Sequence, residues 1–193
     1  MSEFDNIPME NLEGFINEDI TSGISETNIY YIPVDHIEAD VFPPKIGDLG
    51  FSLKTASVLT EDIVLKADRY FSKLRVQTET GEVKDSLGGN KGNKKGKSSF
   101  EFFLTDTSPE HISFVDIFKN VPLVMFAMDK QGRLRKIGST ISPAYFESGE
   151  GTTGKGPDDD AGFQIMVSTS NGRLALIYEG NIKLKGDDPT PTP

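Results

Sequence analysis

The alternation of apolar and polar residues along the chain predicts a protein built mainly from β-strands. Residues 29–34 are rich in β-branched and aromatic side chains, and residues 51–60 and 70–79 alternate with a period of two. Residues 99–105 share that alternation and are the expected partner of 70–79. Residues 123–128 are apolar without interruption, which predicts a buried strand.

The strongest local signal is a hairpin near the C-terminus. Residues 163–170 and 173–178 flank Asn171-Gly172, a pair that favours two-residue hairpin turns. Shorter strands are expected at 133–138 and 141–146, the first of them after a tight turn.

One short helix is expected at residues 109–120. Ser108 suits the N-cap, Pro109 suits the first helical position, and an apolar stripe follows. Asn120, before Val121-Pro122, marks the end. The expected fold class is therefore mainly β, a sandwich or barrel of roughly nine or ten antiparallel strands with one helix.

Composition divides the 193 residues into one domain with appendages. Residues 1–27 form an acidic N-terminal arm without Lys or Arg, and a disordered tail or a docking arm fits it equally. Within the arm, residues 9–16 place apolar side chains at helical spacing. Residues 28–185 are the single β-rich domain, and residues 186–193 have the composition of a disordered tail.

Two flexible loops of opposite charge are expected inside the domain. Residues 84–97, rich in Lys and Gly, form the long basic tip of a hairpin, and residues 147–162 form an acidic loop. The overall charge of −10 thus lies mostly on appendages. Opposite charges suit head-to-tail association of subunits, whereas solubilising loops on a monomer are the alternative. The candidate contact residues are Lys91, Lys94, Lys95, Lys97, Glu150, Asp158, Asp159 and Asp160.

The residue types that perform catalysis are scarce. The chain has no Cys, no Trp and two His, His36 and His111, neither in a nucleophile context. Residues 149–156 resemble a phosphate loop, but the Gly-Lys pair is followed by Gly156 instead of Ser or Thr. The run 158–160 lacks the alternating register of an EF-hand calcium loop. We expect no enzyme, no cofactor and no metal site.

The sequence also lacks the signals of export or membrane insertion. Its acidic beginning has no positively charged and apolar signal regions, and no apolar run approaches the roughly 20 residues that a bilayer requires. The acidic balance argues against a protein that mainly grips phosphate backbones.

The order of these features resembles the tail tube (major tail) proteins of tailed bacteriophages and the related tubes of contractile injection systems. The likeness lies mainly in residues 100–180, which contain Phe118-Lys119-Asn120, residues 133–138, Ala144-Tyr145-Phe146 and the Asp-rich run before Gly162-Phe163. The shared features are a β-rich domain, a long hairpin loop, one helix before an apolar strand, and a closing hairpin.

This resemblance implies a virion structural protein that is assembled in the host cytoplasm. Its partners would be further copies of itself in hexameric rings stacked through the long loop and the terminal arm, and other virion tail proteins. DNA would pass through the lumen without chemistry, and no membrane would be involved. A tail-terminator or head–tail connector protein, and a receptor- or glycan-binding β-sandwich module, are the alternatives.

Overall fold

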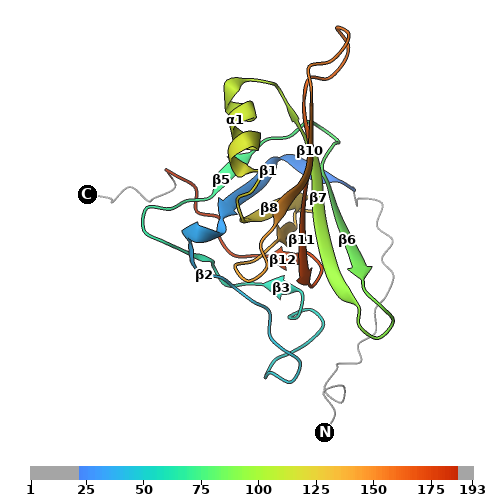
Figure 1. The fold of residues 1–193 in the computed structure, drawn as a ribbon. Helices are drawn as coiled ribbons and strands as arrows, with labels where there is room; N and C mark the ends of the chain where they lie inside the picture. Colours follow the sequence, from blue (N-terminus) through green and yellow to red (C-terminus); the bar gives the residue numbers. More distant parts are fainter. Residues whose placement is uncertain (1–21, 187–193) are drawn as a thin grey trace, which may run out of the picture.

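The computed structural model describes residues 22–186 and confirms a mainly β fold with one α-helix in that part of the chain (Figure 1). A six-stranded sheet has the order β3-β12-β9-β8-β1-β5, and a four-stranded sheet has the order β10-β11-β7-β6. A small third sheet pairs β2 with β4. The strands are β1 (Ile24–Pro33), β2 (Ile37–Ala39), β3 (Val58–Leu59), β4 (Val64–Leu65), β5 (Ser72–Leu74), β6 (Glu82–Gly88), β7 (Lys95–Thr105), β8 (Leu123–Asp129), β9 (Leu134–Ile137), β10 (Tyr145–Thr152), β11 (Gly162–Gly172) and β12 (Leu176–Tyr178).

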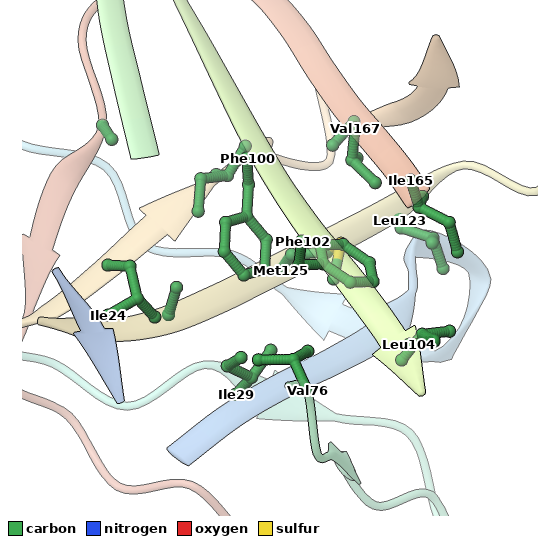
Figure 2. Close-up of a cluster of buried hydrophobic side chains, with 14 residues drawn as sticks. Ile24, Ile29, Val76, Phe100, Phe102, Leu104, Leu123, Met125, Ile165 and Val167 are labelled. Atoms are coloured by element: carbon green, nitrogen blue, oxygen red, sulfur yellow. The ribbon is translucent and has the colours of Figure 1, made fainter. Parts of the chain in front are cut away.

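The two large sheets pack face to face around the first of two cores. Phe100 and Phe102 of β7 are fully buried, and their rings lie 4.8 Å apart between centroids. Ile165 and Val167 of β11 add to them from the same sheet, as Figure 2 shows. From the six-stranded sheet, Ile29, Leu123 and Met125 complete the sandwich core.

A second core covers the other face of the six-stranded sheet. Val124 and Phe126 of β8 point into it, whereas their neighbours Leu123 and Met125 point into the first core. Phe71 packs edge-on against Phe126, with 5.5 Å between ring centroids. Strand β8 is therefore buried on both faces, which explains its unbroken apolar sequence and confirms that prediction.

The four-stranded sheet, by contrast, keeps a polar outer face. Along β7 the buried residues alternate with residues that are exposed or half-buried. Lys84 lies on this outer face between Glu82 at 2.9 Å and Glu101 at 3.3 Å, and these two carboxylates raise the pKa of its ammonium group. One face packed and one face open is the usual state of an antiparallel sheet.

The predicted helix is confirmed as α1 (Pro109–Phe118), with Ser108 at the N-cap and Pro109 in the first turn. The Ser108 hydroxyl bonds to Nδ1 of His111 at 2.8 Å and not to a backbone amide, so the histidine is part of the helix start. Phe114 and Phe118 pack against Tyr31 and the first core, with ring centroids 5.3 and 5.4 Å from the tyrosine ring.

Two of the expected strands are wrong in extent and pairing. Residues 51–57 form turns, because the Ser52 and Thr55 side chains bond to each other's backbone amides at 2.8 and 3.1 Å. Of residues 70–79, β5 alone is strand and it pairs with β1, not with β7. The rest of that segment crosses between the sheets, since the Val76 amide bonds to Glu26 and the Gln77 amide to Phe103.

The predicted C-terminal hairpin is also wrong. Asn171 and Gly172 continue β11, where Gly172 pairs with Gly96 of β7. The chain then crosses to the other sheet, where β12 pairs with β9 and β3. The crossing is possible because Gly96 has no side chain: a Cβ there would lie 2.4 Å from the carbonyl carbon of Arg173.

Both expected flexible loops are shorter than predicted, because strands occupy part of each range. In the range 84–97, only residues 89–94 form the turn, because β6 extends to Gly88 and β7 begins at Lys95. In the range 147–162, β10 runs to Thr152 and pairs with β11, so the connecting turn is 153–161. Of residues 141–146, only the last two belong to a strand.

The arm boundary shifts as well. Strand β1 begins at Ile24, inside the range 1–27 that the sequence assigned to the arm. The apolar spacing of residues 9–16 and the tail from residue 187 lie outside the described residues. Within the described part, no helix has the length and apolar character needed to cross a bilayer.

Candidate assembly surfaces

The predicted contact residues gather at two ends of the four-stranded sheet. Strand β7 is antiparallel to both β6 and β11, so the β6–β7 turn and the β10–β11 turn lie at opposite ends of the strands. Figure 1 shows the β10–β11 turn beyond the top of the sheet and the β6–β7 turn at the bottom. Sequence alone placed the two groups on loops without relating them in space.

The lower end carries the basic residues, here called the basic turn (residues 89–97). Lys91, Lys94, Lys95 and Lys97 are all exposed. Lys94 closes the turn by donating from Nζ to the carbonyl oxygen of Gly89 at 2.6 Å. Lys95 and Lys97 follow on β7, on the exposed side of that strand. The structure thus brings the four lysines together within one hairpin.

The upper end carries the acidic residues, here called the acidic turn (residues 153–161). Asp159 accepts hydrogen bonds from the amides of Lys155 and Gly156, both at 2.8 Å, and these bonds lower the pKa of its carboxyl group. Asp160 accepts from Nε2 of Gln77 at 2.9 Å, while Asp158 is exposed. Glu150 lies lower, on β10 opposite Gln164.

A partly exposed polar contact fixes the basic turn's strands to the rest of the body. Asp85 of β6 accepts from the Ser98 hydroxyl at 2.7 Å and from the Ala175 amide at 2.8 Å, and it pairs with Nη2 of Arg135 on β9. Asp85 therefore joins the four-stranded sheet to the six-stranded sheet. Nε of Arg135 is buried without a hydrogen-bond partner among the described residues, so Asp85 is its main charge compensation.

A second ion pair, and this one is buried, lies near the same end of the molecule. Nζ of Lys136 pairs with Oδ1 of Asp40, and both side chains are almost fully buried. Oδ2 of Asp40 accepts from the Thr140 amide at 2.9 Å. Burial lowers the pKa of Lys136 although the Asp40 carboxylate opposes that effect. The pair ties the base of loop 40–57 to β9.

Two grooves open beside this pair. One, of about 190 Å³, is lined by Lys136, Ile141 and Arg173 among others, and the other, of about 440 Å³, is lined by Lys54 and Thr55. Val41, Phe42 and Pro43 line both grooves, so this segment is a wall that the two grooves share. Hydrophobic patterning predicts no strand or helix for residues 41–48 and so gives no indication of these grooves, although apolar residues in a Pro- and Gly-rich stretch are a signal for a contact surface.

The acidic residues of these two ends do not gather into a metal site in the part of the chain that the structure describes. Among residues 22–186, no three His, Asp or Glu side chains lie close enough together to hold a metal ion. The three consecutive aspartates are divided between a turn cap, a contact to Gln77 and solvent. The three carboxylates therefore have separate surroundings.

Comparison of the chain with protein-family models, with curated proteins and with solved structures gives no match.

Proposed function

We propose that this protein is a virion structural subunit of the tail-tube type, which associates head to tail into stacked rings that form a conduit for DNA. The observation that carries the proposal is the placement of the basic turn and the acidic turn at opposite ends of one sheet. Opposite charges on opposite ends attract between successive copies and repel when two like ends meet. Such a heterologous contact repeats without limit along one axis.

The exposed strands of the four-stranded sheet support lateral contacts in the same assembly. Its edge strands β6 and β10 are seven and eight residues long, and each pairs with a neighbour on one side only within the described chain. An unpaired edge offers backbone donors and acceptors to a further strand. In a ring, β6 of one copy would face β10 of the next, and the polar outer face would form a continuous surface.

The test is charge reversal with a matched control. In the variant Lys91→Glu, Lys95→Glu, Lys97→Glu, the basic turn would repel the acidic turn, so stacking should be lost. The control Lys66→Glu, Lys73→Glu, Arg75→Glu makes the same change of net charge at exposed positions outside the two turns. Sedimentation velocity and electron microscopy measure the assemblies.

Ionic strength gives a second measurement on the wild type. Because the Debye length falls from about 10 Å at 0.1 M salt to about 3 Å at 1 M, stacks held by exposed charges should shorten as salt rises. A combined variant that also carries Asp158→Lys and Asp160→Lys restores opposite charges and should restore stacking. Wild-type protein that stays monomeric at high concentration, with no ring or tube in micrographs, would refute the proposal.

A further inference from the structure

Three segments that contribute to the lining of the two grooves also expose apolar side chains, here together called the apolar end surface. It consists of Phe42, Ile46 and Leu49 from loop 40–57, Ile141 from the β9–β10 connection, and Leu174. Leu49 is completely exposed and Ile141 is 81% exposed, and the other three are between 42% and 49% exposed. Exposed apolar side chains beside grooves favour a contact site.

Loop 40–57 is held in shape by its own hydrogen bonds. Asp48 accepts from the Lys45 amide at 2.7 Å, and the Phe51 amide bonds back to the Asp48 carbonyl at 3.1 Å. At its base, Asp40 is fixed by Lys136 and Thr140. The loop therefore presents Ile46 and Leu49 to solvent from an ordered backbone, and the two grooves along residues 41–43 lie beside them.

Positive charge borders the smaller groove, whose lining includes Lys136 and Arg173 and, within the described part of the chain, no acidic side chain. The larger groove, by contrast, is lined by Lys54, Glu61 and Glu179 among others. Arg173 lines the smaller groove, and its backbone lies directly against Gly96 in the basic turn. Leu174 follows in the chain, between Arg173 and the Ala175 amide that Asp85 holds. An occupant that complements the smaller groove and the adjoining basic turn must therefore combine apolar side chains with negative charge.

One segment of this chain has that composition. Residues 1–21 contain six acidic and no basic residues, interspersed with large apolar ones. The acidic turn has negative charge but no large apolar side chain, so it cannot fill the grooves. Twenty-one residues can span up to about 70 Å when extended, which is more than a domain of this size measures across. The apolar members are Phe4, Ile7, Met9, Leu12, Phe15, Ile16 and Ile20.

We infer that residues 1–21 bind across the apolar end surface, with their apolar side chains in the smaller groove beside Phe42 and Ile141 and their carboxylates toward the basic turn. The inference goes beyond the proposed stacking and does not depend on it. The segment covers the same surface whether it comes from its own chain or from a neighbouring copy.

The absence of tryptophan from the chain permits a direct test in the full-length protein. Phe4→Trp and Phe15→Trp each introduce a single fluorophore in the segment. If the segment is docked, emission is blue-shifted and acrylamide quenches it several-fold less than it quenches a free peptide of residues 1–21 with the same substitution. Adding Leu49→Asp and Ile141→Asp should return quenching to the free value.

The control is Ile112→Asp with Ile117→Asp on α1, which makes the same chemical change at two side chains that are 50% and 63% exposed. It should leave quenching unchanged. All four positions are exposed, so the variants should fold, and circular dichroism checks this. Tryptophan quenched as strongly as in the free peptide, or protection that survives Leu49→Asp with Ile141→Asp, overturns the inference. Light scattering on the same samples reports association separately: a monomer with a protected tryptophan supports docking and contradicts stacking.

Discussion

Replacing Asp85 with alanine should destabilise the fold more than any other single change at an acidic residue on β6 or β7. Three groups lose their partner: the Ser98 hydroxyl, the Ala175 amide and the Arg135 guanidinium. Ser98 is 1% exposed, so its hydroxyl cannot turn to solvent. Arg135 already has one buried nitrogen without a partner, and it would lose its counter-charge as well.

The magnitude follows from these three losses. A buried donor left without an acceptor costs about 1 to 3 kcal/mol, and a broken buried ion pair costs about 3 to 5 kcal/mol. The Asp85 and Arg135 side chains are 21% and 24% exposed, and a pocket of about 310 Å³ beside Arg135 can admit water, so the ionic part is smaller. We expect a total of roughly 3 kcal/mol, or a fall in melting temperature of about 6 to 12 °C.

Urea denaturation and thermal melting followed by circular dichroism measure the effect. Asp85→Asn keeps an oxygen for Ser98 and Ala175 and removes the charge, so its loss should be about half as large. Asp85→Ala with Arg135→Met removes the uncompensated cation and should recover part of the stability. Asp158→Ala, at an exposed position, is the control and should have no effect. A loss below about 1 kcal/mol for Asp85→Ala would refute the reasoning.

Two further predictions concern charged groups. Lys136→Met leaves the Asp40 carboxylate buried without its cation and should cost about 3 to 5 kcal/mol at neutral pH in urea denaturation. Burial lowers the pKa of Lys136 from its usual 10.5, so between the folded and unfolded pKa values the unfolded chain binds more protons. The contribution of this residue to the free energy of unfolding therefore rises with pH across that range. Lys136→Met should remove that rise, and an unchanged dependence of the free energy of unfolding on pH would contradict the assignment. Two amide hydrogen bonds lower the pKa of Asp159 from its usual 3.8. Order in the acidic turn should therefore be fully present above pH 3.8 and be lost as the pH falls through the lower pKa of the folded state. In Asp159→Ala, amide exchange at Lys155 and Gly156 should accelerate about tenfold at neutral pH by NMR, and equal rates would show that the cap is not formed.

The sequence predicted those elements whose signals are local. The unbroken apolar run of β8 and the Ser108-Pro109 start of α1 depend on neighbouring residues, and both are confirmed. Asn171-Gly172 is an equally strong local signal, but tertiary contacts override it. Because Gly96 has no side chain, the backbone of Arg173 can pass close to it. The Ala175 amide then donates a hydrogen bond to Asp85, and β12 joins the six-stranded sheet.

The candidate contact residues could be chosen from the sequence by type and charge, whereas their positions relative to one another could not. Counting charges identified the four lysines and the aspartates, and the register of β7 with β6 and β11 is what separates them to opposite ends. The pairs Asp85–Arg135 and Lys136–Asp40 join residues 50 and 96 positions apart. No local pattern connects residues so distant, because their proximity arises only after the two sheets pack.

The eleven residues of β7 also set the distance between the two charged ends of the four-stranded sheet. At about 3.4 Å per residue, the strand measures roughly 35 Å, and this length is set by backbone geometry instead of side chains. Substitutions on the open face of the sheet can therefore change what the surface contacts without changing the distance between its positive and negative ends. Only inserting or deleting residues in register across neighbouring strands would alter that distance.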